Sequence, residues 1–224
     1  QKTSYALPFA EQIQGKELSY NNIQDANAAL NVLRDFDEPF CVALKHMNPC
    51  VAGIGKTIEE AWQEAYEADK VSIYGGIVAV NRELTAEVAS GMKPIFLEIV
   101  IAPSFSPEAL EILSAKKNLR VLKVDMTRVE GPVTQYTGVN GGMLVQQLDT
   151  FMEKLTPERC VTMAKPAGSQ MKDLEFGWKI VKHVKSNAIV VVRDNRTLGV
   201  GAGQTNRVGS AEIALSQDRA AGFT

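Results

Sequence analysis

Cysteine and histidine are scarce in this sequence, which limits the metal and disulfide chemistry that it can support. Its 224 residues include only two histidines and three cysteines, Cys41, Cys50 and Cys160. The number of cysteines is odd and no two have the Cys-x-x-Cys spacing, so neither a metal finger nor a disulfide scaffold is predicted. Few, unpaired cysteines are typical of the reducing cytoplasm, which is the compartment we expect, and no bound metal is expected.

A strong charge of one sign and long apolar runs are also missing. Lys and Arg total 24 against 26 Asp and Glu, which gives a net charge of −2, and the basic residues are scattered. Such a chain offers no basic surface for a nucleic-acid backbone, although a small anionic ligand needs only a few local charges. Apolar runs such as Ala188–Val192 are far too short to span a bilayer, and Gln1–Tyr5 lacks the apolar core of a signal peptide. We therefore expect no nucleic-acid or membrane partner.

What the sequence does contain is the composition of a globular domain, with 45% hydrophobic and 22% charged residues. Apolar residues recur at helical spacing from Ile23 to Leu33, and Thr57 with Glu60 is a capping-box pattern before a second helix. Short apolar runs between the helices predict buried strands at 40–44, 76–80, 97–102, 119–124 and 188–192. Strands that alternate with helices predict an α/β architecture.

The order of helix, apolar strand, polar turn and Gly-x-Gly occurs twice along the chain, at 23–55 and at 174–203. Between the two copies the pattern loosens, and breakers such as Gly131-Pro132 interrupt it. This repetition predicts an internal duplication. The predicted parts are a first lobe over 1–130, a bridging segment over 131–172 and the start of a second lobe over 173–224.

The pair Lys45-His46 directly follows the first predicted buried strand, and Pro49, Gly53 and Gly55 predict a loop after it. In open α/β sheets, ligands bind beyond the carboxyl ends of the strands. Histidine exchanges protons near pH 7, and an adjacent lysine adds positive charge for a phosphate or a developing oxyanion. The pattern alone does not separate such a site from a surface lysine beside a partly buried histidine.

Two segments in the second half of the chain, one polar and one rich in glycine, are also open to two interpretations. Asn187 precedes a predicted strand, where its amide could donate to an oxyanion or simply belong to a turn that ends a helix. The glycines of 199–203 could bring backbone amides to a phosphate. Their spacing departs from the dinucleotide pattern Gly-x-Gly-x-x-Gly, so a tight turn between strands is favoured.

In the first half, Tyr74 and Gly75 stand before the predicted strand at 76–80. The paired glycines there allow a ligand to approach the backbone, although a strand-entry turn is the commoner meaning. Glu98 interrupts an apolar run. Its carboxylate lies either on a solvated face or in a site where it accepts from ribose hydroxyls or an amine, and we favour the site.

Six stretches of the chain, in the same order as in the family, together resemble the AICAR formyltransferase domain of bifunctional purine biosynthesis enzymes. These stretches are Gln14–Asn22, Lys45–Pro49, Val71–Gly76, Ile101–Pro103, Val181–Ala188 and Gly199–Arg207. Each stretch is weak alone, but the combination is specific and covers nearly the whole chain. The resemblance implies two cytidine-deaminase-like lobes, each a three-layer α/β/α unit, with the second lobe incomplete.

The resemblance also implies a reaction and its residues. The family transfers a formyl group from 10-formyltetrahydrofolate to the amine of phosphoribosylaminoimidazolecarboxamide (AICAR), which gives FAICAR in IMP biosynthesis. Carried over by position, His46 is the proton-transfer residue, Lys45 is its electrostatic partner, and Asn187 orients the carboxamide or the formyl oxygen. The substrate-binding residues implied in the same way are Tyr74, Gly75, Glu98, Arg207 and Val208.

The resemblance further implies a homodimer with active sites across the subunit interface, and a parent protein that also carries an IMP cyclohydrolase domain. The chain is then expected to be a fragment without that domain and without C-terminal segments that supply substrate contacts, so its activity in isolation is in doubt. Two positions depart from the family pattern. Tyr74 stands where phenylalanine is usual, and Cys50 is followed by Val51 rather than glycine.

Two other function classes compete with this one. A zinc nucleoside deaminase would share the lobe fold, but it needs Pro-Cys-x-x-Cys, and Gly53 occupies the place of the second cysteine after Pro49-Cys50. A binding domain that holds the nucleotide or the folate without turnover is the second alternative. Zinc analysis distinguishes the first, and AICAR binding without turnover would support the second.

Overall fold

The computed structural model describes residues 5–127 and 133–222, so Gly131, Pro132 and most of Gln1–Tyr5 lie outside the described residues. The helices are α1 Tyr20–Leu33, α2 Ile58–Ala68, α3 Ala86–Met92, α4 Pro107–Ser114, α5 Gly168–Val181 and α6 Arg207–Ala220, with the short 3-10 helices η1 Leu7–Phe9 and η2 Pro157–Arg159. The strands are β1 Glu11–Gln14, β2 Phe40–Lys45, β3 Asn48–Ile54, β4 Ile77–Val80, β5 Ile99–Ala102, β6 Arg120–Lys123, β7 Thr134–Val139, β8 Gly142–Gln147, β9 Ile189–Arg193 and β10 Arg196–Gly201.

One mixed sheet organises the fold. Eight strands lie in the order β1-β6-β5-β4-β2-β3-β10-β9, with β4, β5 and β6 parallel and the other neighbours antiparallel. Every residue of β4 and β5 is buried, as are the first five residues of β2. Such continuous apolar strands require cover on both faces of a sheet. The predicted α/β fold class is confirmed.

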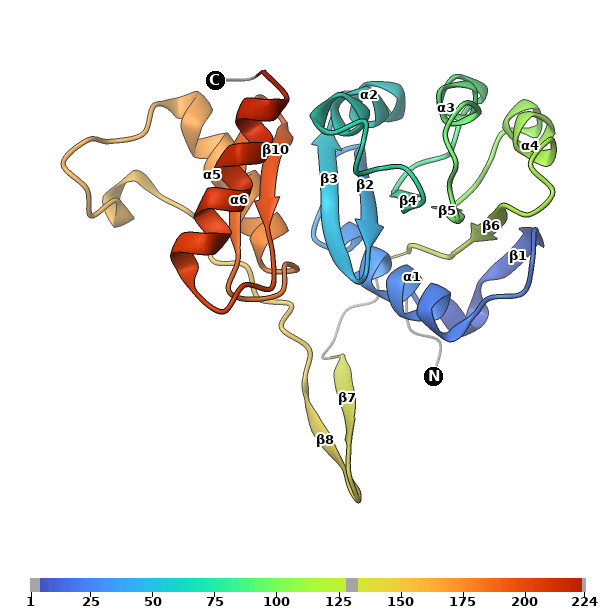
Figure 1. Ribbon diagram of the computed structural model, residues 1–224, viewed down its shortest axis with the longest axis horizontal. Coiled ribbons are helices and arrows are strands. Elements are labelled where there is room, and N and C mark those ends of the chain that lie inside the picture. The colour runs from blue at the N-terminus through green and yellow to red at the C-terminus, as the bar shows by residue number, and fades with distance from the viewer. Residues whose placement is uncertain (1–4, 128–132, 223–224) are drawn as a thin grey trace.

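Helices cover both faces of this sheet (Figure 1). Trp62 of α2, Val88 of α3 and Leu113 of α4 share one apolar core with the sheet. Leu30 of α1 and Ile180 of α5 belong to a second core on the opposite face. Burying a large apolar side chain stabilises a fold by roughly 1.5–3 kcal/mol, so these two cores hold the three layers together.

The strands β9 and β10 extend the same sheet beyond β3, and α5 and α6 lie against them (Figure 1). Val200 packs into the core of α1 and α5, whereas a side chain at Gly199 or Gly201 would meet the backbone of α6. The helices α5 and α6 therefore lie on opposite faces of β10. The division into lobes over 1–130 and 173–224 stays a prediction.

A two-stranded hairpin, β7 with β8, projects from the body within the predicted bridging segment (Figure 1). Every residue in both strands is exposed. Two strands alone are marginally stable in water, so this hairpin gains little stability from its own side chains.

Two segments predicted as a loop or a turn form strands instead. Pro49 and Gly53 lie in β3, and Gly199 and Gly201 lie in β10. A Cβ at Gly53 would lie 2.5 Å from the backbone nitrogen of Ala65, and one at Gly201 would lie 1.9 Å from the backbone oxygen of Ser210. These glycines serve close contact between strand and helix rather than chain reversal.

Asn81 closes the loop between α1 and β2, and we expect its replacement to weaken the fold. Its side-chain oxygen accepts from the Phe40 amide at 2.9 Å, and its amide donates to the Phe36 and Glu38 carbonyls at 3.1 and 2.8 Å. Asn81→Ala leaves two buried backbone groups and one partly buried group without these partners, which should lower the free energy of unfolding by about 2 kcal/mol. Urea denaturation measures this. Gln63→Ala, at an exposed helical hydrogen bond, is the control and should change stability by less than about 0.5 kcal/mol.

Candidate active site

All eight predicted site residues lie at one end of the strands of the sheet. We call this end of the sheet the site edge, or simply the edge. Register places Lys45 opposite Asn48 at this edge, and Leu44 pairs with Ile77, the first residue of β4. Gly201 ends β10 opposite Ile189, at the same edge. The edge therefore combines the carboxyl ends of β2 and β10 with the amino ends of β3, β4, β5, β6 and β9. Lys45 ends β2, so the Lys45-His46 pair lies beyond the carboxyl end of a strand, as predicted, but the neighbouring strand β4 runs antiparallel and contributes its amino end to the same edge.

Lys45 and His46 lie at the tip of the hairpin that β2 and β3 form. His46 and Met47 both have positive φ, 53° and 63°, as a tight two-residue hairpin turn requires. Asp25 of α1 fixes this turn, because its Oδ1 accepts from the Met47 amide at 2.6 Å. His46 is exposed, while Lys45 is half-buried beside Gly76. The fold thus presents an accessible imidazole next to a partly shielded ammonium group.

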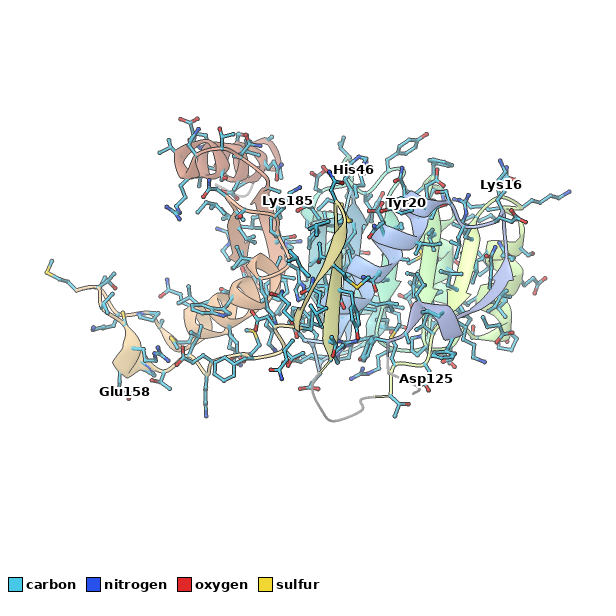
Figure 2. The ribbon with its side chains drawn as sticks, turned by 90° about the horizontal axis from the view of Figure 1, so that it is seen from below. Lys16, Tyr20, His46, Asp125, Glu158 and Lys185 are labelled. Atoms are coloured by element: carbon cyan, nitrogen blue, oxygen red, sulfur yellow. The ribbon has the colours of Figure 1, made fainter. Side chains whose placement is uncertain are left out.

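Asn187 comes from the other half of the chain, in the loop between α5 and β9. Its backbone and side-chain amides both donate to the Gln204 carbonyl at 3.0 Å. Two residues earlier, the Lys185 amide donates to Oδ1 of Asn48, beside His46, at 2.9 Å. Figure 2 shows His46 and Lys185 at the same end of the molecule. The structure therefore brings the Lys45-His46 turn and the Asn187 loop together.

Tyr74 and Gly75 form the entry to β4, next to the Lys45 strand. Gly75 has φ of 74° and its amide donates to the Phe96 carbonyl at 2.7 Å. The rings of Tyr74 and Phe96 lie 5.5 Å apart, and both are largely exposed. Two exposed aromatic rings at a sheet edge offer a surface on which a flat heterocycle can stack. Sequence reasoning missed Phe96, whose only signal was an aromatic residue just before an apolar run.

Glu98 lies just before β5, one strand further along the edge. Its Oε2 accepts from Nη1 of Arg120 at 2.8 Å, and Nε of Arg120 donates to the Glu17 carbonyl. The Arg120 side chain is only 11% exposed, whereas that of Glu98 is 39% exposed. A nearly buried guanidinium therefore holds an accessible carboxylate in one orientation. Arg120 was not predicted, since nothing local marks it.

Arg207 and Val208 begin α6 at the same edge, and both are exposed. Asn206 caps this helix, with its Oδ1 accepting from the Gly209 amide at 2.7 Å. Oγ of Ser210 donates to the Asn187 carbonyl at 2.8 Å. The start of α6 is thereby fixed to the Asn187 loop, but no contact joins it directly to Tyr74 or Glu98 among the described residues.

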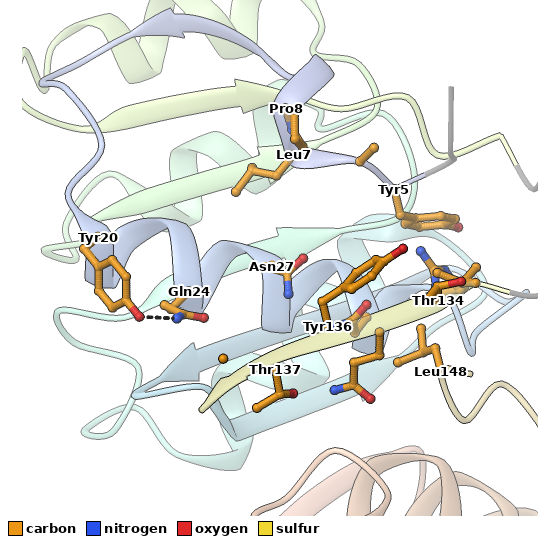
Figure 3. A pocket seen from close by; sticks show the side chains of 16 residues that line it. Tyr5, Leu7, Pro8, Tyr20, Gln24, Asn27, Thr134, Tyr136, Thr137 and Leu148 are labelled. Atoms are coloured by element: carbon orange, nitrogen blue, oxygen red, sulfur yellow. Dashed lines mark hydrogen bonds between the residues drawn. The ribbon is translucent and has the colours of Figure 1, made fainter. Parts of the chain in front are cut away.

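A cavity lies between α1 and the β7–β8 hairpin. It measures about 670 Å³ and separates α1 from the hairpin strand β7, with Tyr20, Asn27 and Tyr136 among its lining residues (Figure 3). None of the predicted site residues lines it. The predicted site is instead an open edge, where hydrogen bonds and charges, rather than a closed pocket, would hold a substrate.

Among the described residues, Cys50 lies near this edge as a thiol whose pKa is raised, and no group of metal ligands forms there. Burial raises the pKa of the Cys50 thiol to about 12, and its Sγ donates to the Ala43 carbonyl at 3.3 Å. Over residues 5–127 and 133–222, no three His, Cys, Asp or Glu side chains are grouped so that they could hold a metal ion. A zinc deaminase site, which needs such a group, is not formed by these residues.

The same described ranges contain no helix that is both long and apolar enough to cross a membrane.

Comparison with known proteins identifies relatives for nearly the whole chain. "Bifunctional purine biosynthesis protein PurH" of Lactococcus lactis subsp. cremoris (strain MG1363) is 57% identical over 215 residues, which cover 95% of this chain and 42% of that protein. The proteins of the same name from Bacillus cytotoxicus and Bacillus mycoides (strain KBAB4) are 56% and 55% identical, with the same coverage. The chain therefore spans about two fifths of the length of the curated relatives it matches.

The comparison with family models covers the chain more completely. The model described as "AICARFT/IMPCHase bienzyme" matches residues 1–217. A match over so much of the chain, together with relatives above 50% identity, leaves no ambiguity about descent. The chain belongs to the AICARFT/IMPCHase bienzyme family.

Proposed function

We propose that this chain carries the AICAR formyltransferase function of its family, rather than the IMP cyclohydrolase function that the parent protein also has. The reaction transfers the formyl group of 10-formyltetrahydrofolate to AICAR, in the cytoplasm. One observation carries the proposal. A Lys-His pair on one half of the chain and an asparagine loop on the other meet at the sheet edge, tied by the bond from Lys185 to Asn48.

The chemistry requires a base because the AICAR amine is a poor nucleophile, with its lone pair delocalised towards the carboxamide. The amine attacks the formyl carbon and its proton passes to His46. When the tetrahedral intermediate collapses, the bond from the formyl carbon to the folate nitrogen breaks, and His46 returns the proton to that nitrogen. Lys45 stabilises the negative charge that develops on the formyl oxygen. Asn187 orients the carboxamide or that oxygen. The role of Asn187 suits a side chain that is fixed by its hydrogen bond to the Gln204 carbonyl.

The substrate-binding roles follow the layout of the edge. Tyr74 and Gly75 present a ring and an open backbone to the heterocycle, and Glu98, oriented by Arg120, accepts from ribose hydroxyls. Arg207 at the start of α6 supplies positive charge for an anionic group, with the helix amino end adding to it. Val208 supplies apolar contact. AICAR binding, measured by calorimetry, tests this assignment. Glu98→Gln and Arg207→Ala should each weaken it about tenfold, and an unchanged affinity in both would refute it.

We also propose that the two halves are duplicated lobes. The element orders α1-β2-β3-α2 and α5-β9-β10-α6 match, and both hairpins turn on two residues of positive φ, His46-Met47 and Asp194-Asn195. In each copy, glycines of the second strand touch the following helix. Superposition of 23–55 on 174–203 in an experimental structure tests the duplication, which fails if the two units do not superpose.

We predict that the protein self-associates as a homodimer. The β7–β8 hairpin exposes Tyr136, Met143, Leu144 and Val145 on a projecting arm, and exposed apolar surface of this kind commonly marks an interface. Sedimentation over micromolar to high concentration should show a dimer. A strictly monomeric mass throughout would contradict the prediction.

The second candidate function is that of a binding domain without turnover. The open edge supports this candidate, because solvent-exposed site residues fit binding as well as catalysis. AICAR binding by a chain that transfers no formyl group, alone or joined to the remaining sequence of its parent, would support this candidate over the enzyme.

A further inference from the structure

A partly buried ion cluster joins the two halves of the chain. Oδ2 of Asp35 lies 2.6 Å from Nε2 of His183 and 3.1 Å from Nζ of Lys182. The three side chains are only 8%, 16% and 12% exposed. Asp35 follows the end of α1, and Lys182 and His183 follow the end of α5. The cluster therefore fixes the end of one helix to the end of the other.

The surroundings of the Asp35 carboxyl group favour its charged form. Burial alone raises the pKa of Asp35, but the hydrogen bond from His183 and the charges of His183 and Lys182 outweigh it, so the pKa lies below its usual value. Arg34 and Asp149 line the same 240 Å³ cavity as this carboxylate. Removing one partner of a buried ion pair leaves an uncompensated charge, and this makes the pair costly to break.

The cluster is one of several attachments along one short segment. From His183 the chain runs to Lys185, whose amide donates to Oδ1 of Asn48, and then to Asn187, whose amides donate to the Gln204 carbonyl. The attachment of His183 to Asp35 involves charged groups. The others are neutral hydrogen bonds, and they include those from the Gly203 amide to the Lys185 carbonyl at 2.7 Å and from Ser210 to the Asn187 carbonyl at 2.8 Å. Neither Asp35 nor His183 belongs to the site edge itself.

We propose that the Asp35–His183 pair is a positioning clamp that holds the Asn187 loop against the Lys45-His46 turn. This inference rests on the proposed function for its effect on turnover, but its effect on the loop does not depend on it. An error of about 1 Å in the placement of a catalytic group can cost a factor of 10² in rate. Loss of the clamp therefore lowers kcat while AICAR still binds through the rest of the edge.

The first test measures amide hydrogen exchange of Lys185 and Asn187 in this chain. His183→Leu removes the donor to Asp35 and should speed exchange of both amides about tenfold, whereas His183→Gln keeps a donor and should restore slow exchange. The control is Glu64→Gln, which removes another ion pair between the halves, Glu64 with Arg196 at 3.5 Å. Arg196 begins β10 at the opposite edge, so this variant should leave both amides unchanged. Equal exchange in wild type and His183→Leu would overturn the clamp.

The second test uses whichever form of the protein transfers a formyl group. At equal folded fraction, His183→Leu and Asp35→Asn should each lower kcat about tenfold with KM changed less than about twofold, and His183→Gln should recover most of kcat. A merely structural role would predict equal losses in Glu64→Gln, and that outcome would overturn the proposal. If no form transfers formyl but exchange responds as described, the proposed function fails and the clamp stands.

Discussion

His46→Ala should lower kcat for formyl transfer by about 10²–10⁴-fold, the range that a general base contributes. The amine of AICAR cannot complete its attack without losing a proton, and His46 is the accessible imidazole at the hairpin tip. Because the side chain is exposed and makes no hydrogen bond in the described residues, its removal should leave folding and AICAR affinity nearly unchanged. Steady-state kinetics and calorimetry on the same preparations measure both quantities.

The matched control is the second histidine of the chain. His183→Ala disturbs the buried contact with Asp35, so it should cost stability and no more than about tenfold in kcat. Equal losses of turnover in the two variants at equal folded fraction would show that His46 has no special role. Near-normal turnover of His46→Ala would show the same.

Gly201→Ala should lower the free energy of unfolding by about 3 kcal/mol, at the upper end of what overpacking usually costs. The added Cβ would lie 1.9 Å from the Ser210 carbonyl oxygen and 2.7 Å from its carbon. These are backbone atoms, so relief requires α6 to move away from β10. Ser210 also donates to the Asn187 carbonyl, so the same movement should disturb the site. Urea denaturation gives the stability.

Gly203→Ala separates crowding from backbone conformation. Gly203 has φ of 66°, and no atom lies within 4 Å of an added Cβ, so only the cost of a left-handed alanine remains, about 1 kcal/mol. If this control lost as much stability as Gly201→Ala, close packing of β10 on α6 would not be the reason for the glycine.

The strands were predictable because the apolar residues of each strand alone indicate that it is buried. The runs at 76–80 and 97–102 contain the fully buried β4 and β5, and no partner needs to be known to recognise them. The glycines of 199–203 were wrongly predicted to form a turn, because the same Gly-x-Gly pattern occurs in turns and in strands that pack closely against a helix. Which applies depends on α6, several residues away.

The candidate site residues could be named from the sequence where a motif contains them, whereas their structural partners could not, because these are distant in sequence. Lys45, His46 and Asn187 stand in stretches that resemble the family. Arg120 orients Glu98 from 22 residues away, and His183 binds Asp35 from 148 residues away. Neither pair has a spacing that marks it, because the contacts exist only once the sheet and both helix layers have formed.

The most direct test of the account is a formyl-transfer assay with AICAR and 10-formyltetrahydrofolate. It should be run on this chain beside a version extended at both ends with the remaining sequence of a relative, and FAICAR should be measured by mass spectrometry. We expect the extended protein to form FAICAR, and we expect His46→Ala nearly to abolish FAICAR formation. A folded extended protein that binds AICAR but forms no FAICAR, or forms it equally well without His46, would contradict the account.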